Sequence, residues 1–443
     1  GSSNAAVGNG ALLSNTTGER NSAFGANSLQ QNTTGKRNTA VGQGALFANT
    51  TASNNTAIGR DALLSNTTGA DNVAVGYQSL DANTDGDYNT ALGYGSLTSA
   101  TTAGSNVAVG YNALDVTTTG GGNTGLGANA LGANTTGIRN TAIGQAALSS
   151  NTTADFTVAV GYLALNSNTT GTSNVAVGSG SLQNNQTGTS NTAVGRSAMA
   201  FNTGNNNTAA GERALYQNTS GSNNAAFGRR TLYENTTGDY NVAIGTQALE
   251  SNIDRDGNVA IGYQALFQNT AQFCTAVGYE AARNSTGDSN QAITAFGTQA
   301  LKQNTTGAGN NAFGSFALRD NTTGDNHTAA GNGALMENTT GSNNSAFGVH
   351  AIRRNTTGNY NVAFGNFALD HNISGSNNIA IGYDSLTANT TDNNTALGYQ
   401  SLKSSTTGTQ NVAIGADALA ANTTSPFNTA IGYASLNSNT TGS

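Results

Sequence analysis

A 17-residue repeat is the feature that most constrains the fold of this chain. Twenty-six glycines, starting with Gly8, Gly25 and Gly42 and ending with Gly432, follow an apolar residue, and 21 of the 25 spacings between them are 17 residues. The repeat reads N-x-A-[V/I/L/F]-G-x-x-[A/S]-L-x-x-N-T-T-G-x-x. We call this glycine the repeat glycine and number slots from it, so that Val41 is at slot −1 of Gly42. A short fixed period is typical of solenoids, and we predict one continuous repeat region over residues 1–443.

Each repeat is too short for a pair of helices, and its Gly, Asn and Thr content disfavours helix. Two short strands joined by tight turns fit the length. The first strand is x-A-[V/I/L/F], as in Thr39–Val41, and it ends at Gly42, where the chain needs a positive φ or a close backbone approach. The second is centred on Ala45-Leu46, and residues 49–51 form the returning loop. The predicted fold is all-β, a parallel β-solenoid or β-roll of 26 coils.

Adjacent apolar residues in the first strand predict two covered faces. Successive side chains of a strand point to opposite faces, so Ala40 and Val41 cannot both face one interior if the segment is extended. The same reasoning applies to Ala45 and Leu46. Because strands that are apolar on both faces are usually covered on both, we expect one face to line the coil and the other to contact another chain. The alternative is a β-arc whose kink turns both residues inward.

Asparagine fills two slots of the repeat. Slot −4 is Asn in 22 of 26 repeats, and its substitutes are Thr157, Cys274, Ile293 and His327. Asparagine side chains in register can hydrogen-bond along a stack, so this slot predicts a ladder. The Asn of the N-T-T triplet predicts a second row or a turn cap.

One region departs from the period. Between Gly262 and Gly297 the spacings are 16 and 19 residues, and Ala282 replaces the leucine of slot +4. We expect the extra residues near Asn290–Ile293 to bulge outward or to kink the solenoid.

Composition limits the classes of partner. Charged residues make up 9% of the chain and the net charge is −7, with no cluster of Lys or Arg, so we expect no nucleic-acid partner. Cys274 is the single cysteine, which excludes a disulfide within the chain. No apolar run is long enough to cross a bilayer, so we expect no direct membrane insertion. Capping, stalk and anchor domains are not visible in the sequence.

The sequence contains no catalytic constellation. Histidines 327, 350 and 371 occupy three different slots, so they cannot form a repeated metal site, and we expect ladder or surface roles for them. The aspartates of two loops, 81, 85 and 87 in one and 254 and 256 in the other, are interpreted as solvated charges. We therefore predict a protein that is not an enzyme and needs neither a cofactor nor a metal.

Two sets of residues are candidates for surface contacts. Nine of the 14 tyrosines occupy slot +1, where an exposed aromatic ring could contact a sugar or a protein or simply pack on the neighbouring coil. These are Tyr77, Tyr94, Tyr111, Tyr162, Tyr263, Tyr279, Tyr383, Tyr399 and Tyr433. The N-T-T triplets are formal glycosylation acceptors or polar loops selected for their geometry. They include Asn15, Asn32, Asn66, Asn235 and Asn439.

The motif N-x-A-[V/I]-G, as in residues 72–76 and 241–245, resembles the head repeats of trimeric autotransporter adhesins (the YadA-like head) and similar repeats of phage tail fibres. The resemblance implies a left-handed parallel β-roll, a homotrimer, export to the cell surface or the virion, and adhesion. The adhesin repeat is typically 14 residues, and the 17-residue period here suggests a longer outer loop at N-T-T-G-x-x.

These observations predict a structural or adhesive extracellular fibre that presents repeated loops to a host receptor, a glycan or a surface. A self-assembling surface filament built head to tail is the principal alternative. An ice-binding solenoid and a polysaccharide-degrading β-helix are further alternatives.

Overall fold

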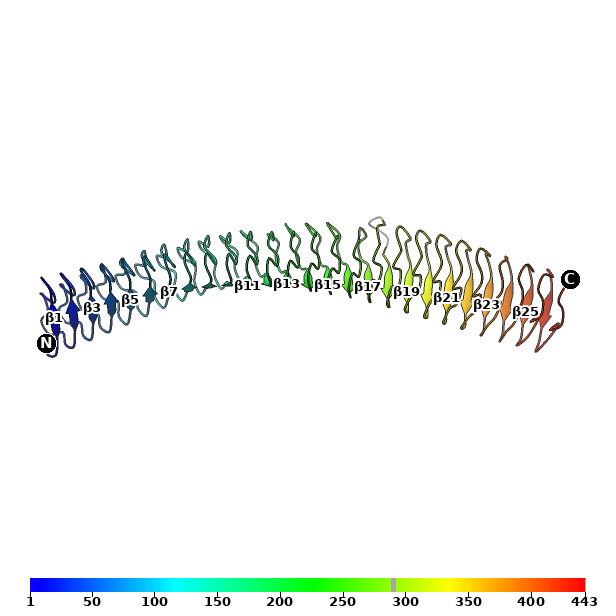
Figure 1. Ribbon diagram of the computed structural model, residues 1–443, viewed down its shortest axis with the longest axis horizontal. Coiled ribbons are helices and arrows are strands. Elements are labelled where there is room, and N and C mark those ends of the chain that lie inside the picture. The colour runs from blue at the N-terminus through cyan, green and yellow to red at the C-terminus, as the bar shows by residue number, and fades with distance from the viewer. Residues whose placement is uncertain (288–291, 443) are drawn as a thin grey trace. The chain divides into compact units, whose positions relative to one another are not determined.

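A computed structural model describes residues 1–287 and 292–442, and these residues form short strands, turns and bends without any helix. The chain divides into two compact units, Gly1–Ser222 and Asn223–Ser443. Each unit is a stack of coils with one strand per coil, so each is a parallel β-solenoid, as the sequence predicts (Figure 1).

The first unit contains β1 (Ala5–Val7), β2 (Ser22–Phe24), β3 (Thr39–Val41), β4 (Thr56–Ile58), β5 (Val73–Val75), β6 (Thr90–Leu92), β7 (Val107–Val109), β8 (Thr124–Leu126), β9 (Thr141–Ile143), β10 (Val158–Val160), β11 (Val175–Val177), β12 (Thr192–Val194) and β13 (Thr208–Ala210). The second contains β14 (Ala225–Phe227), β15 (Val242–Ile244), β16 (Val259–Ile261), β17 (Thr275–Val277), β18 (Thr294–Phe296), β19 (Asn311–Phe313), β20 (Thr328–Ala330), β21 (Ser345–Phe347), β22 (Val362–Phe364), β23 (Ile379–Ile381), β24 (Thr395–Leu397), β25 (Val412–Ile414) and β26 (Thr429–Ile431).

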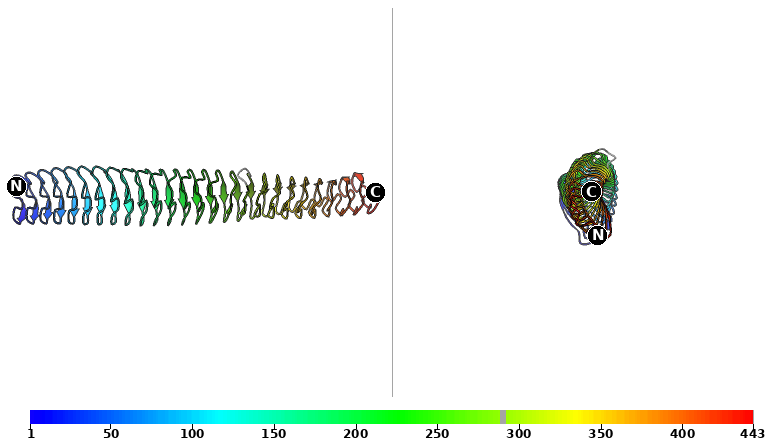
Figure 2. Two further views of the ribbon diagram at one scale, coloured as in Figure 1. Left: turned by 90° about the horizontal axis from the view of Figure 1, so that it is seen from above. Right: turned by 90° about the vertical axis from the view of Figure 1, so that its right-hand side faces the viewer.

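Successive strands pair in parallel with equal slots side by side. Ala40 of β3, for example, pairs with Ala57 of β4, and Val41 pairs with Ile58. Figure 2 shows the strands of the first unit in one line along one side of the coils. This register places every slot of the repeat in its own row, so a residue type that recurs in the sequence becomes a continuous row on the molecule.

The backbone conformation and the close approach of the next coil both require glycine at the position of the repeat glycine. Gly42 has φ +133°, which side chains rarely adopt, and a Cβ at this position would lie 2.5 Å from the carbonyl oxygen of Gly59 in the next coil. The close approach of stacked coils therefore excludes a side chain, as the sequence predicts.

The predicted second strand at Ala45-Leu46 is wrong, because this segment consists of consecutive turns. The amide of Ala45 donates to the carbonyl of Gly42 (3.4 Å), and the amide of Phe47 donates to Gly44 (3.1 Å). Leu46 has φ +52°, in the left-handed region. Its amide still donates to Ala62 of the next coil (3.0 Å), so the coils remain hydrogen-bonded here without extended backbone.

The core of each coil is a column of leucine and alanine. Leu46 and Ala45 are both completely buried, which corrects the expectation that they face opposite sides. The turn geometry brings both side chains inward. In β3 the strand expectation is confirmed, since Ala40 is completely buried and Val41 is exposed.

Two buried asparagine rows close the coils. In the first row the amide nitrogen of the Asn38 backbone donates to Oδ1 of Asn21 (2.9 Å), and Nδ2 of Asn38 donates to the carbonyl of Ala52 (2.8 Å). In the second, Nδ2 of Asn49 donates to Oδ1 of Asn32 (2.8 Å) and also to Ala52 (3.1 Å). The second row is thus both a side-chain ladder and a turn cap, whereas the first mainly joins side chains to backbone.

The irregular region keeps its strand register. Thr275 of β17 pairs with Thr294 of β18, and the amide of Thr275 donates to the carbonyl of Ile293 (2.9 Å). Strand pairing is therefore continuous through Ile293 across the 19-residue spacing, which argues against the predicted kink. Of the segment 290–293, where the alternative of a bulge is predicted, residues 290 and 291 lie outside the described residues.

Candidate functional site

The outer face of the strands carries a row of exposed apolar side chains at slot −1, which we call the outer apolar row. It arises because the alanine of slot −2 points into the coil and its neighbour must point out. Members more than a third exposed include Phe24, Val41, Ile58, Leu92, Leu126, Ile143, Val177 and Val194 in the first unit and Phe227, Ile244, Ile261, Phe296, Phe313, Phe347, Phe364 and Leu397 in the second.

Aromatic members of this row stack from coil to coil. The rings of Phe296 and Phe313 lie 5.6 Å apart and nearly parallel, and Phe347 and Phe364 are at the same distance with a larger tilt. Contiguous exposed apolar surface of this kind usually marks an interaction site on a soluble protein. The outer apolar row is therefore the first candidate for a functional surface.

The tyrosines of slot +1 form short stacks on the surface. Ring centroids are 5.3 Å apart for Tyr77 and Tyr94 and 5.5 Å for Tyr94 and Tyr111. In the second unit, Tyr263 lies 5.4 Å from Tyr279, and Tyr383 lies 5.7 Å from Tyr399. All of these tyrosines pack on a neighbouring coil, and all except the half-buried Tyr77 are exposed, as predicted for this slot.

This geometry limits what the tyrosine stacks can bind. The ring faces of Tyr94 are covered by Tyr77 and Tyr111, so a sugar could stack only on the end of such a group. Within the stack, only the edges of the tyrosine rings remain accessible to a ligand. The isolated Tyr162 and the terminal Tyr433 are also exposed.

A further set of aromatic residues occupies slot −5 of coils that are not adjacent to one another, and these residues were not predicted as a site. Its members have positive φ and are more than half exposed; they are Tyr88, Phe156, Tyr240, Phe273, Tyr360 and Phe427. Arg139 lies over the ring of Phe156 at 5.5 Å. The signal available in the sequence was the shared slot immediately before the first asparagine row.

The asparagines proposed as glycosylation acceptors are mostly internal. Asn32, Asn66 and Asn235 are completely buried. Nδ2 of Asn66, for example, donates to Oδ1 of Asn49 (3.0 Å) and to the carbonyl of Gly69 (2.9 Å). In the folded chain these nitrogens are not available for a glycan, whereas Asn15 and Asn439, in the terminal coils, are half-buried.

The aspartates of slot −6 satisfy backbone amides. Oδ1 of Asp87 accepts from the amide of Ala70 (2.7 Å), and Oδ1 of Asp256 accepts from the amide of Asp239 (2.8 Å). These carboxylates therefore help to join adjacent coils, a role that their interpretation as solvated charges missed. Asp81 is partly buried, and burial raises the pKa of its carboxyl.

Two of the four residues that replace asparagine in the first row have structural roles. Cys274 is buried, its amide donates to Oδ1 of Asn258 (3.0 Å), and burial raises the pKa of its thiol to about 11. His327 is also buried, and its Nδ1 accepts from the amide of Asn344 (3.2 Å). Within the described ranges there is no group of three or more His, Cys, Asp or Glu residues suited to hold a metal ion.

Neither a protein-family model nor a curated protein matches this chain. Residues 1–287 and 292–442 include no long apolar helix of the kind that spans a bilayer. Fold and surface thus define the class as a parallel β-solenoid repeat protein with rows of exposed apolar and aromatic side chains.

Proposed function

We propose that this chain is a structural and adhesive extracellular fibre that presents repeated surface loops for attachment. The observation that carries the proposal is the outer apolar row. A strand face that is apolar at nearly every coil is expected to be buried against another protein surface. The repeat itself contains no recurring acid–base or metal-binding group, which fits a structural and adhesive function.

In this proposal three chains assemble about a common axis with their outer apolar rows facing inward. The coils are left-handed, as in the adhesin heads that the repeat resembles. Burial of apolar surface contributes about 25 cal/mol per Å², so the contribution of a single residue such as Val41 is small. Repetition at successive coils makes the sum large, and small side chains at Ala210 and Ala330 permit a closer approach locally.

Attachment uses the surfaces that remain outside such an assembly. The N-T-T turns recur at many coils and the slot −5 aromatics at several separate ones, so a weak contact to a host receptor, a glycan or another surface is repeated along the fibre. Avidity raises the overall affinity of repeated weak contacts without any new contact type. The site of action in this proposal is the cell surface or a virion fibre.

Binding of the labelled full chain to an array of glycans and extracellular-matrix proteins tests the adhesive part. We expect retention on at least one class of ligand and a marked loss when association of the chains is abolished, because avidity then disappears. A full-length, assembled chain that binds no class above background would contradict adhesion. Long filaments in electron microscopy would favour the head-to-tail alternative.

A further inference from the structure

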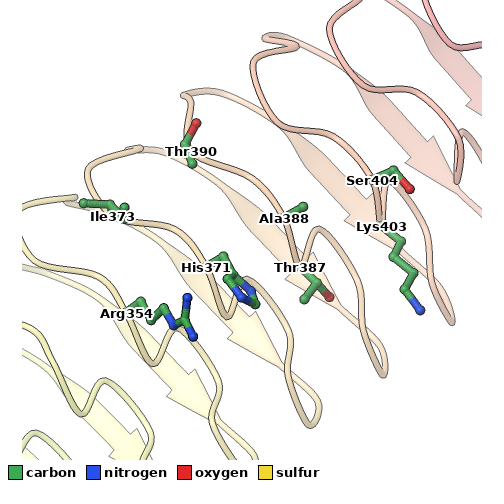
Figure 3. Close-up of a pocket in the computed structure, with 8 residues that line it drawn as sticks. All are labelled: Arg354, His371, Ile373, Thr387, Ala388, Thr390, Lys403 and Ser404. Atoms are coloured by element: carbon green, nitrogen blue, oxygen red, sulfur yellow. The ribbon is translucent and has the colours of Figure 1, made fainter.

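A shallow hollow of about 580 Å³ lies on the second unit, within the range of small-ligand sites. It crosses the coils that carry β21 to β24 and is lined by Arg354, His371, Ile373, Thr387, Ala388, Thr390, Lys403 and Ser404 (Figure 3). Its residues come from four different repeats, so no motif within one repeat predicts it.

In-register stacking explains why a hollow forms here. Slot +6 is occupied by Arg354, His371, Ala388 and Ser404 in four successive coils, so two long side chains are followed by two short ones. The short side chains form the floor. Figure 3 shows Arg354 and His371 on adjacent coils at one end, and Ile373 and Thr390 at the turns along one edge.

The charges around the hollow leave a positive excess. Arg353 pairs with the buried carboxylate of Asp370 (2.9 Å), and Lys403 pairs with Asp384 (3.0 Å). Arg354 is exposed, and across the described residues no carboxylate lies within ion-pair distance of it. Its guanidinium, a planar fork of donors, is therefore open to an external anion.

The other lining groups add hydrogen-bonding and apolar surface. The Thr390 hydroxyl donates to the carbonyl of Thr406 (2.8 Å), and the Thr387 hydroxyl donates to the carbonyl of Phe367 (3.2 Å), so both oxygens retain capacity to accept. Ser404 supplies a further hydroxyl, and Ile373 and Ala388 supply apolar contacts.

We propose that this hollow binds an anionic saccharide, whose sulfate or carboxylate group pairs with Arg354 and whose ring lies over Ala388 beside His371. An inorganic anion would need only the guanidinium, whereas hydroxyl acceptors and apolar floor together suit a sugar, which has both hydroxyls and C–H faces. The inference rests on the proposed adhesive function and names one class of ligand for it.

Isothermal titration of the full chain with a sulfated, uronate-containing disaccharide tests the proposal, with a neutral disaccharide, inorganic sulfate and an acidic peptide as comparisons. We expect Arg354→Gln to weaken binding roughly tenfold, as for loss of one charge-assisted hydrogen bond. His371→Asn should also weaken it, and Ala388→Phe, which fills the floor without changing charge, should abolish it. Arg37→Gln is the matched control, because Arg37 is an exposed arginine of the first unit.

Circular dichroism establishes that each variant keeps its fold. The proposal is overturned if the disaccharide does not bind, if the neutral disaccharide, free sulfate or the peptide binds as tightly, or if Arg37→Gln has the same effect as Arg354→Gln. An assembled fibre that attaches to surfaces without binding the disaccharide would refute this inference alone. Disaccharide binding by a chain that neither assembles nor attaches would refute the proposed function alone.

Discussion

Ala40 and Val41 are neighbours in β3, yet Ala40 is completely buried whereas Val41 is 38% exposed. The alternation of side chains in an extended strand produces this contrast, and the stacking of coils in register repeats it. A strand of three residues thereby supplies both a core contact and an outward apolar contact. The outer apolar row is the consequence, and the proposed assembly depends on it.

Charge on the outer apolar row is expected to prevent association without unfolding the coils. The double variant Phe227→Lys and Ile244→Lys places two ammonium groups on outward positions of β14 and β15. We predict a lower sedimentation coefficient with an unchanged circular dichroism spectrum. Thr246→Lys, on the same coil but at slot +1, is the control and should sediment like the wild type. Unchanged sedimentation of the double variant would argue against an interface on this face.

The repeat glycine is expected to tolerate no side chain. At Gly144, φ is +131° and a Cβ would lie 2.6 Å from the carbonyl oxygen of Gly161, so Gly144→Ala should lower the free energy of unfolding by about 1–3 kcal/mol. At Gly132 the nearest atom would be 3.4 Å away, and Gly132→Ala should change it by about 0.5 kcal/mol or less. Chemical denaturation compares the two variants, and equal effects would contradict the close-approach explanation.

A β-branched residue at slot +4 is expected to be strained. Ile352 is buried with φ +49°, where a β-branched side chain is a conformational outlier. We predict that Ile352→Leu raises the free energy of unfolding by about 0.5–1 kcal/mol. The reciprocal change in the next coil, Leu369→Ile, should lower it by a similar amount. Denaturation midpoints that move in the opposite directions would refute the argument.

His327 is expected to make the second unit sensitive to acid. Asn344 donates its amide hydrogen to Nδ1 of His327, so the ring must be neutral there, and burial lowers the pKa of the imidazole. The unfolded chain takes up the proton near the ordinary value of about 6.5. Stability contributed by the neutral ring is thus complete above that pH and is lost as the pH falls below it.

Thermal unfolding at pH 7.5 and pH 5 measures this effect. The wild type should lose more stability between the two values than His327→Asn, which restores the amide found at slot −4 in 22 of 26 repeats. The other two histidines are retained in the variant and provide the background. Equal losses in both proteins would exclude His327 as the sensitive group.

Cys274 is expected to be unreactive in the folded chain. Its thiol is buried, and its pKa of about 11 leaves roughly one thiolate in a thousand at pH 8. Alkylation by iodoacetamide, followed by mass spectrometry, should therefore be very slow until denaturant is added. Rapid alkylation of the native chain would contradict the burial of this residue.

Much of this architecture could be predicted because one residue type at each slot has one physical role. The strand at Thr39–Val41, the repeat glycine at Gly42 and the two asparagine rows all follow from residue chemistry and period. The turns around Leu46 could not, since an Ala-Leu pair carries no signal that separates a strand from left-handed turns. The burial of Asn66 was missed because a polar triplet also suits an exposed loop.

The hollow beside Arg354 and Ala388 illustrates the remaining limit. Its residues are unremarkable within their own repeats, and only stacking in register brings slot +6 of four coils together. A consensus repeat does not show how the residues at slot +6 differ from one coil to the next. The hollow could therefore be predicted only from the residues that depart from the consensus.

Sedimentation equilibrium of the full chain is the measurement that tests the central claim most directly. If three chains cover one another's outer apolar rows, the mass in solution is three times the 44.3 kDa of one chain. It should remain so on dilution through the micromolar range. A stable species of 44.3 kDa would contradict the claim, because the outer apolar row would then be exposed to water in the native protein.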